Sequence, residues 1–190
     1  MNVLVVYDSQ YGNTERLAEA IGEALAPCGV VRVSKVTPEQ LTGLDVLVVG
    51  SPTQRFRPTP AVSAFLASVP AAGLRGVRVA AFDTRFSAQR ARSMSAVLGF
   101  VVRLLGPSAY AATHLAQQLE QRGGTLIAPP EGFRVTDAEG PLEEGELERA
   151  ASWGAKLRLA PEPLGPRHDH VVPGPGGGKA QARSQHSGRG

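Results

Sequence analysis

The chain has 190 residues, a formal net charge of +3 and a mean hydropathy of −0.09, which are the values of one ordinary domain with room for a tail. Its single cysteine excludes an intramolecular disulfide framework, and its apolar runs are too short to span a membrane. No basic stripe interleaved with aromatic residues is present, so we expect no nucleic-acid partner. No secretory leader precedes the first apolar run, so we expect a cytoplasmic protein.

Composition divides the chain near residue 160. Residues 161–190 contain the run GPGGGKAQARSQHSGRG and show no apolar periodicity. Such a segment cannot bury enough apolar surface to offset the entropy of ordering. We therefore predict one folded domain over residues 1–160 and a disordered, Gly/Pro-rich, basic tail over residues 161–190.

Apolar runs of strand length alternate with helical periodicity along the predicted domain. The runs at 2–7, 45–51 and 76–84 are almost continuously apolar, as strands buried on both faces are. The run at 30–36 alternates and predicts an edge strand, and TLIAPP at 125–130 predicts a short last strand.

Helices are expected between these strands. The periodic segments cover residues 13–27, 59–69, 106–124 and 140–159, with a further helix in 88–105 that Gly99 interrupts. Pro107 or Ser108 is expected to begin the helix in 106–124. Strands that alternate with helices predict an α/β fold with a doubly wound parallel sheet covered on both faces. In such sheets ligands bind beyond the carboxyl ends of the strands.

The first of those strand ends carries the polar run DSQYGNT, from Asp8 to Thr14, just before a predicted helix. The free N–H groups of a helix's first turn attract an anion, and Ser9, Asn13 and Thr14 can add donors. The loop has no lysine or arginine and no GK[ST], so it is not a nucleoside-triphosphate loop. The simpler reading is that Ser9 or Asn13 is only a helix N-cap. Several neutral donors around Gly12, which allows close approach of the backbone, favour a monophosphate that stays bound over a triphosphate that turns over.

The run SQYGNT resembles the phosphate-loop signature of the flavodoxin family, [ST]-x-[ST]-G-x-T, with Tyr11 at the third position. The run VVGSPTQRFRPTPAVSAFL resembles the second loop of that family, GSP-[TV]-[YW]-x-G, and matches it from Gly50 to Thr53. The resemblance covers residues 1–159.

The resemblance implies a flavodoxin-like, doubly wound, five-stranded parallel sheet of order 2-1-3-4-5, with non-covalently bound FMN. The phosphate would lie on the first loop and the flavin ring between the second loop and the third, AFDTRFS, with Phe56 and Phe86 as apolar walls. The implied cofactor-binding residues are Ser9, Gln10, Tyr11, Gly12, Asn13, Thr14, Ser51, Pro52, Thr53, Gln54, Arg55, Phe56, Asp83, Thr84, Arg85 and Phe86. No catalytic residue and no metal ligand is predicted.

The chain departs from the family pattern in its second and third loops. Gln54 stands where the family often has Tyr or Trp, Arg55 replaces the following glycine, and the third loop lacks the tyrosine that typically covers the flavin. Family electron shuttles are strongly acidic, whereas Arg55, Arg57 and Arg85 fall in the predicted flavin loops here. We therefore expect a flavin potential above that of a low-potential shuttle, because a nearby positive charge stabilises the anionic reduced flavin.

Residues 88–106 look like an insertion relative to the family. The apolar stripe of Val97, Phe100, Val101, Leu104 and Leu105 is expected to pack into the core. A lid over the flavin, or a homodimer contact through residues 94–105, is the alternative.

Three functions remain open at this stage. The favoured one is electron transfer through FMN to a redox partner protein or a small-molecule electron acceptor. The second is a flavodoxin-type reductase that uses a pyridine nucleotide to reduce a quinone. The third is a flavin-free flavodoxin-like interaction module, because this scaffold hosts many functions.

Overall fold

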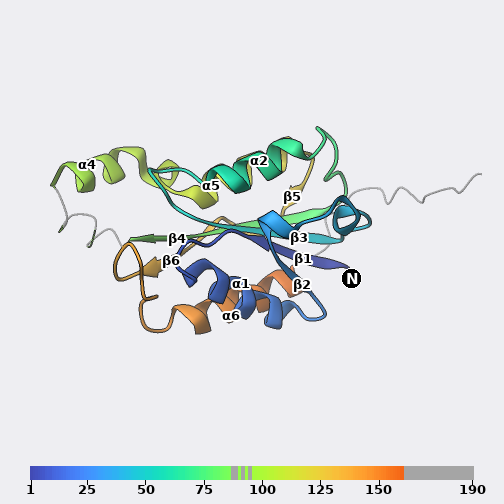
Figure 1. Cartoon of the computed structure of the whole chain (residues 1–190), viewed down its shortest axis with the longest axis horizontal. Coiled ribbons are helices and arrows are strands. Elements are labelled where there is room, and N and C mark those ends of the chain that lie inside the picture. The colour runs from blue at the N-terminus through green and yellow to red at the C-terminus, as the bar shows by residue number, and fades with distance from the viewer. Residues whose placement is uncertain (87–89, 91–92, 94–95, 161–190) are drawn as a thin grey trace, which may run out of the picture.

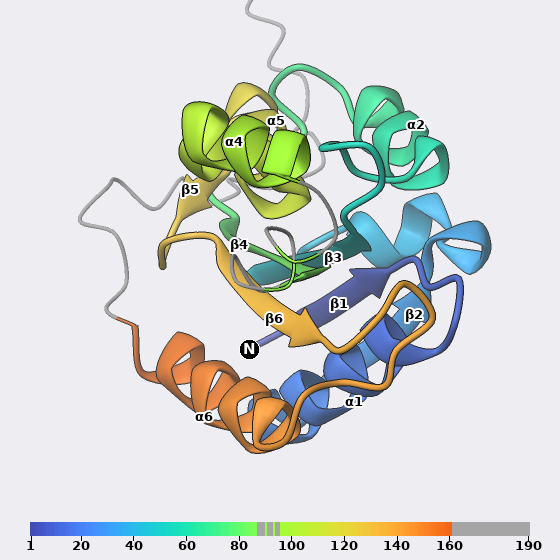
Figure 2. The same cartoon turned by 90° about the vertical axis from the view of Figure 1, so that its left-hand side faces the viewer.

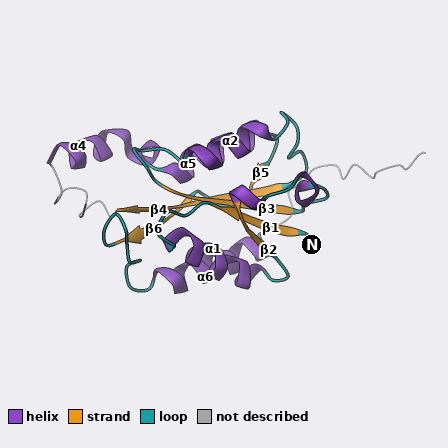
Figure 3. Cartoon of the chain, in the orientation of Figure 1, coloured by secondary structure: helices purple, strands orange, loops and turns teal. Residues whose placement is uncertain are grey.

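A parallel sheet lies between two helical layers in the computed structural model, which describes residues 1–86, 90, 93 and 96–160 (Figure 1). The predicted tail and part of the predicted insertion lie outside these residues. One face of the sheet carries α1 and α6, and the other carries α2, α4 and α5, as Figure 3 shows by secondary structure. The helices are α1 (Asn13–Leu25), α2 (Pro60–Ser68), α4 (Ala96–Leu105), α5 (Ala111–Gln121) and α6 (Glu146–Leu159).

The strand order is β2-β1-β3-β4-β5, with every pairing parallel, which confirms the predicted order 2-1-3-4-5. The strands are β1 (Val3–Tyr7), β2 (Gly29–Arg32), β3 (Val46–Pro52), β4 (Arg78–Phe86), β5 (Thr125–Leu126) and β6 (Glu131–Val135). In β1, β3 and β4, the continuous apolar runs are buried on both faces, as their composition predicts.

The predicted last strand at 125–130 is wrong in extent. Only Thr125 and Leu126 pair with β4, and pairing resumes with β6, which the sequence analysis did not predict. Pro129 and Pro130 stand in the gap, and because proline has no N–H it cannot continue a ladder of hydrogen bonds. The fifth position of the sheet is therefore filled in two pieces, and β6 ends beside the carboxyl end of β4.

Other element boundaries also differ from the sequence-based expectation. The edge strand β2 ends at Arg32, and a 3-10 helix follows over Val33–Lys35. Helix α4 continues through Gly99, so that glycine does not interrupt it. Helix α5 begins at Ala111, because the proline-containing segment Gly106–Ala109 forms a separate 3-10 helix.

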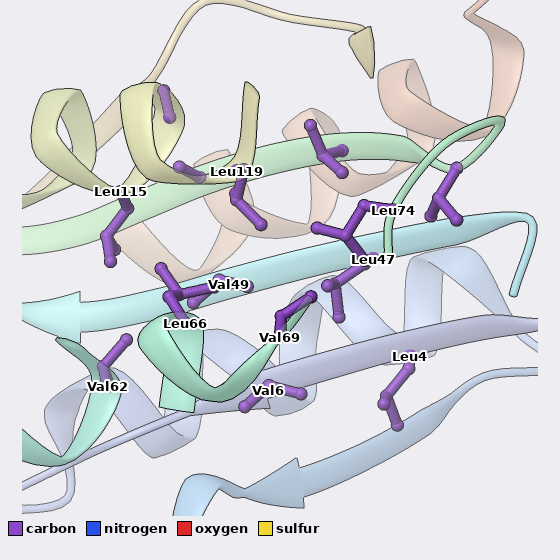
Figure 4. Close-up of a cluster of buried hydrophobic side chains, with 14 of the residues drawn as sticks. Leu4, Val6, Leu47, Val49, Val62, Leu66, Val69, Leu74, Leu115 and Leu119 are labelled. Carbon is purple, nitrogen blue, oxygen red and sulfur yellow. The ribbon is translucent and has the colours of Figure 1, made fainter. Parts of the chain in front are cut away.

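Two apolar clusters hold the layers together. Figure 4 shows the cluster between the sheet and helices α2 and α5, in which Leu66 and Leu115 are fully buried. On the other face, Phe82, Phe133 and Trp153 contact one another edge to face, with centroid separations of 6.0–6.2 Å. The two clusters fix α1, β3 and β4 relative to one another and so place the loops at their ends.

A buried carboxylate joins β6 to α6. Glu146 is 1% exposed and accepts hydrogen bonds from the backbone N–H of Arg134 at 2.9 Å and from its Nη2 at 3.0 Å. Arg149 also bonds Glu146, pairs with Glu131 at 2.6 Å and stacks 4.4 Å from the ring centroid of Phe133. Burial acts to raise the pKa of Glu146, but the hydrogen bonds from Arg149 and Arg134 outweigh it and hold that pKa below its usual value.

We expect Glu146→Gln to lower the free energy of unfolding by about 1–2 kcal/mol at neutral pH, because two charge-assisted contacts are lost. The wild-type advantage should be present above the ordinary carboxylate pKa of about 4.3 and should disappear as the pH falls through the lowered folded pKa. Urea denaturation of both proteins at neutral and acid pH measures this difference. A difference that does not change with pH would contradict an ionised Glu146.

Candidate functional site

A cavity of about 940 Å³ opens at the carboxyl ends of β1, β3 and β4. Its walls come from the loop before α1, the loop between β3 and α2, the end of β4, and the segments around Tyr110 and Ala138. Figure 2 looks toward this end of the sheet, where the ends of β3, β4 and β6 meet. All of the predicted cofactor-binding residues line the cavity except Gly12, Ser51 and Asp83. The cavity therefore brings together three loops that are distant in sequence.

The first loop leaves hydrogen-bond donors free at the start of α1. Helix α1 has Gly12 at its N-cap position, with φ of +83°, and no side chain caps its first turn. Neither Ser9 nor Asn13 is thus an N-cap. The Oγ atom of Ser9 is buried and has no hydrogen-bond partner among the described residues. An orphaned buried hydroxyl beside free helix N–H groups fits a phosphate that accepts from both.

The backbone of this loop is fixed from the outside. Arg32 at the end of β2 donates to the carbonyl oxygen of Ser9 and pairs with Asp8, with its Nη2 3.5 Å from the carboxylate. The guanidinium of Arg32 is therefore engaged by Asp8 and does not line the main cavity. The residues of the first loop that line the cavity are therefore all neutral.

Asn13 holds a second segment against this loop. Its Nδ2 donates to the carbonyl oxygen of Glu139 at 2.9 Å, so one of its amide donors is used within the protein. Gly140, with φ of +100°, lies so close that an added Cβ would be 2.4 Å from Nδ2 of Asn13. The segment between β6 and α6 is thereby fixed over the first loop, and its residue Ala138 reaches the cavity wall.

The second loop ends in a tight, strained hairpin. Gln54 and Arg57 exchange two backbone hydrogen bonds of 2.9 Å, and the central residues Arg55 and Phe56 have φ of +48° and +67°. Such a two-residue turn favours Asn and Gly, and a left-handed backbone costs other residues about 1–2 kcal/mol each. In this strained conformation, Arg55 and Phe56 both lie at the cavity wall.

Asp83 does not line the cavity but holds its walls in place. It is fully buried and accepts hydrogen bonds from Oγ1 of Thr53 at 3.1 Å, the N–H of Ala112 at 2.7 Å and Nε of Arg85. Burial raises the pKa of Asp83, while its contact with Arg85 acts in the opposite direction. Asp83 therefore joins the second loop, the end of β4 and the first turn of α5.

Ser51 has a similar supporting role in the second loop. Its Oγ accepts from the N–H of Thr59 at 3.0 Å, and the side chain of Thr59 caps α2. Ser51 and Asp83 are register partners on adjacent strands, as are the cavity-lining residues Pro52 and Thr84 that follow them. The first pair lies one register position before the second, so it supports the wall from within the sheet, while the second pair forms the wall at the strand ends.

Arg85 is fixed between two segments that the sequence analysis did not assign to the site. Its guanidinium carbon lies 3.9 Å from the ring centroid of Tyr110, just before α5. On β6, a Cβ added to Gly132 would lie 2.1 Å from the same carbon, so a side chain there would displace the guanidinium of Arg85 from this position. Tyr110 lines the cavity and is not among the predicted site residues, because it lies far from the three predicted loops in sequence.

The charge on the cavity wall is positive. Arg55, Arg57 and Arg85 line it, and no aspartate or glutamate among the described residues does. Arg85 is paired with Asp83, whereas Arg55 and Arg57 are exposed and form no ion pair with any described residue. The expected positive charge near the cavity is thus present, and two of its three sources face solvent as well as the cavity.

Helix α4 does not pack as the sequence analysis expects. Phe100, Leu104 and Leu105 are 65%, 73% and 41% exposed, so the predicted core packing is wrong for these three residues. Val102 on the same helix lines the cavity. The amphipathic pattern predicts an apolar stripe but does not identify the surface that buries it. A homodimer contact through residues 94–105 stays a prediction.

The described part of the chain contains neither a membrane-spanning helix nor a cluster of metal ligands. None of its helices is long and apolar enough to cross a membrane, and no cluster of three or more His, Cys, Asp or Glu side chains there could bind a metal ion.

Comparisons with known proteins agree with this geometry. The family model described as flavodoxin matches residues 5–153. A protein named NAD(P)H dehydrogenase (quinone) from Paraburkholderia phymatum is 28% identical over 196 aligned positions, covering 82% of this chain and 98% of that protein. A protein of the same name from Cupriavidus metallidurans is 27% identical over 186 positions, covering 76% of this chain and 94% of that protein.

Among solved structures, oxidised flavodoxin 2 from Bacillus cereus superposes with a TM-score of 0.64 at 20% identity. The match covers 84% of this chain and 99% of that chain. At this identity the likeness concerns the fold.

Replacing Arg55 and Phe56 with Asn and Gly should raise the free energy of unfolding of the flavin-free protein by about 1–2 kcal/mol, because this pair favours a left-handed turn. The matched control replaces both residues with Ala, which removes the same side chains but retains the backbone strain. Urea denaturation compares the two variants. Equal stability of the two variants would show that the hairpin is not strained in solution.

Proposed function

We propose that this chain, which belongs to the flavodoxin family of flavin-binding electron-transfer proteins, binds FMN as its flavin. The FMN is held non-covalently in the cavity. Within that reading, the protein transfers electrons to a redox partner protein or to a small-molecule acceptor that reaches the cavity mouth. When bound, the flavin supplies one- and two-electron transfer chemistry.

The buried and unpartnered hydroxyl of Ser9 carries the proposal of FMN. It lies in the loop before α1, where free N–H groups and the positive end of the helix dipole favour an anion. A loop without lysine or arginine suits a single phosphate that stays bound better than a triphosphate that turns over. Ser9, Thr14 and the first-turn backbone would hold the phosphate of FMN.

The remaining walls suit a planar ring. Phe56, Phe86 and Tyr110 supply aromatic surface, and the cavity of about 940 Å³ lies at the upper end of the usual range for a small-molecule site, about 300–1,000 Å³. The Asp83 contacts orient Thr53 and Arg85 before any ligand arrives. These residues would bind and orient the ring and exclude water from it, while the anion site determines its position along the cavity.

A second candidate function is reduction of a quinone by a pyridine nucleotide. The relatives named NAD(P)H dehydrogenase (quinone) favour it, as does a cavity mouth with two exposed guanidinium groups. Steady-state oxidation of NADPH or NADH by the FMN-loaded protein, with and without a quinone, separates this function from simple electron transfer. A protein that fails to retain FMN would instead favour the flavin-free interaction module.

We expect the purified protein to retain flavin absorbance after addition of FMN and desalting, and Ser9→Ala to weaken FMN binding about tenfold or more, since a charge-assisted hydrogen bond is lost. The same substitution should leave the flavin-free protein as stable as before or up to about 1 kcal/mol more stable, because it removes an unsatisfied buried hydroxyl. Calorimetric titration and thermal denaturation measure the two effects.

Ser68→Ala is the matched control for that substitution. Ser68 is exposed at the end of α2, and its hydroxyl donates to the carbonyl oxygen of Phe65. It should leave FMN affinity unchanged. A Ser9→Ala protein that binds FMN as tightly as wild type would exclude the hydroxyl from the anion site.

The flavin potential should lie above that of a low-potential acidic shuttle, and Arg85→Gln should lower it by about 20 mV. The basis is a charge contribution of about 1 kcal/mol at a few ångströms, converted for a two-electron couple. Arg85→Lys retains the charge and is the matched control. A spectroscopic redox titration measures all three proteins, and a wild-type potential as low as that of the acidic shuttles would reject the expectation.

A further inference from the structure

The second loop places two kinds of group at the cavity mouth within three consecutive residues. Arg55 and Arg57 bring exposed guanidinium groups, and Phe56 between them brings a half-buried aromatic ring. All three line the cavity, and neither Arg55 nor Arg57 pairs with a carboxylate of the described residues. Because two unpaired like charges so close together repel each other, this arrangement favours an anion that lies between them.

The backbone presents these groups at a cost. Arg55 and Phe56 occupy the left-handed region, although Asn and Gly would adopt this turn without strain. Strained positions of this kind are concentrated at ligand sites, where the surrounding structure holds them in place. Here the two hydrogen bonds between Gln54 and Arg57 and the contact from Gln54 to Gln10 hold the hairpin. The strain points to a requirement for these side chains at the mouth.

The cavity wall at Ala138 differs in charge from the hairpin. Asp137 and Glu139 flank the cavity-lining Ala138, and Asp137 pairs with Arg90 at 3.1 Å. The carboxylate of Glu139 would repel an anion, so an anionic ligand is favoured at the hairpin.

We propose that Arg55, Phe56 and Arg57 form a binding site for a small aromatic electron carrier that bears an acidic group, in the class of a carboxylated or sulfonated quinone. The inference rests on the proposed function, because it assigns the substrate class of the flavin site. A guanidinium binds a carboxylate or sulfonate through paired hydrogen bonds, and the phenyl ring contacts the ring of the ligand. Because Arg55, Phe56 and Arg57 belong to one short hairpin, they suit a compact ligand whose acidic group is attached directly to its ring.

The test is equilibrium binding to the full-length, FMN-loaded protein with all components oxidised, so no turnover is involved. The probes are naphthoquinone sulfonate and menadione, which share a ring system and differ in charge. Dissociation constants are obtained by calorimetry at low salt and at high salt. We expect the sulfonate to bind about tenfold more tightly at low salt, and this preference to shrink at high salt as the charges are screened.

Variants assign the preference to the hairpin. Arg55→Gln and Arg57→Gln should each weaken binding of the sulfonate about three- to tenfold and leave binding of menadione unchanged. Gln retains much of the side-chain stem and the same backbone preference, so the comparison isolates the charge. Arg75→Gln is the matched control, because Arg75 is exposed just before the amino end of β4 and does not line the cavity. It should change neither constant.

The outcomes separate the site from the cofactor. Equal affinity of the wild-type protein for the two probes, or an equal loss in Arg75→Gln, would overturn the anion site. Flavin absorbance after desalting is recorded first for every variant and tests the cofactor independently. Should the protein release FMN yet still prefer the sulfonate through Arg55 and Arg57, the proposed function would fail while the anion site would stand.

Discussion

The buried carboxylate of Asp83 is the contact on which the geometry of the cavity depends. An isolated charge in this position would be expensive, and its stability rests on three donors that come from different parts of the chain. Thr53 brings the second loop, Arg85 the end of β4 and Ala112 the first turn of α5. Because each donor is also part of a wall or supports one, a single buried group determines the spacing of three segments around the cavity.

That contact also explains why Tyr110 belongs to the site. Ala111 donates to Oγ1 of Thr53 at 2.9 Å, and Ala112 donates to Asp83, so the start of α5 is held against the second loop. Tyr110 directly precedes these donors and is thereby placed over the guanidinium of Arg85. The third loop contributes Phe86 but no tyrosine, and the tyrosine at the cavity wall comes from beyond α4. Its position follows from the anchoring of α5 and not from its place in the sequence.

The sheet order and the loops of the site could be predicted from sequence because they depend on local patterns. Continuous apolar runs are required of strands that helices cover on both faces, and polar runs at their ends mark the ligand edge. The ends of the last strand could not be predicted in the same way, because they depend on which backbone N–H groups are able to pair with β4. Pro129 and Pro130 interrupt the last strand, but nothing in the apolar pattern shows that pairing resumes at Glu131.

Within the site, position along the strands separates the predicted residues that reach the cavity from those that support it. Pro52 and Thr84 stand at the strand ends and line the cavity, whereas Ser51 and Asp83, one register position earlier, bond to the segments behind it. The left-handed turn at Arg55 and Phe56 could not be predicted, because neither residue type favours it. Such a conformation is determined by tertiary contacts, and the sequence shows only that the glycine expected by family resemblance is missing.

The two ends of the cavity offer different groups to a negatively charged ligand. At the buried end, the loop before α1 provides neutral donors, and the nearby guanidinium of Arg32 is engaged by Asp8. An anion held there without a fixed positive charge gains orientation from backbone dipoles that need no reorganisation. At the open end, Arg55 and Arg57 are unpaired within the described chain and exposed, so their attraction reaches into solvent but weakens with salt. A neutral site suits a cofactor that stays, whereas an exposed charged site suits a ligand that exchanges, and the strained hairpin lies at the exposed, charged end.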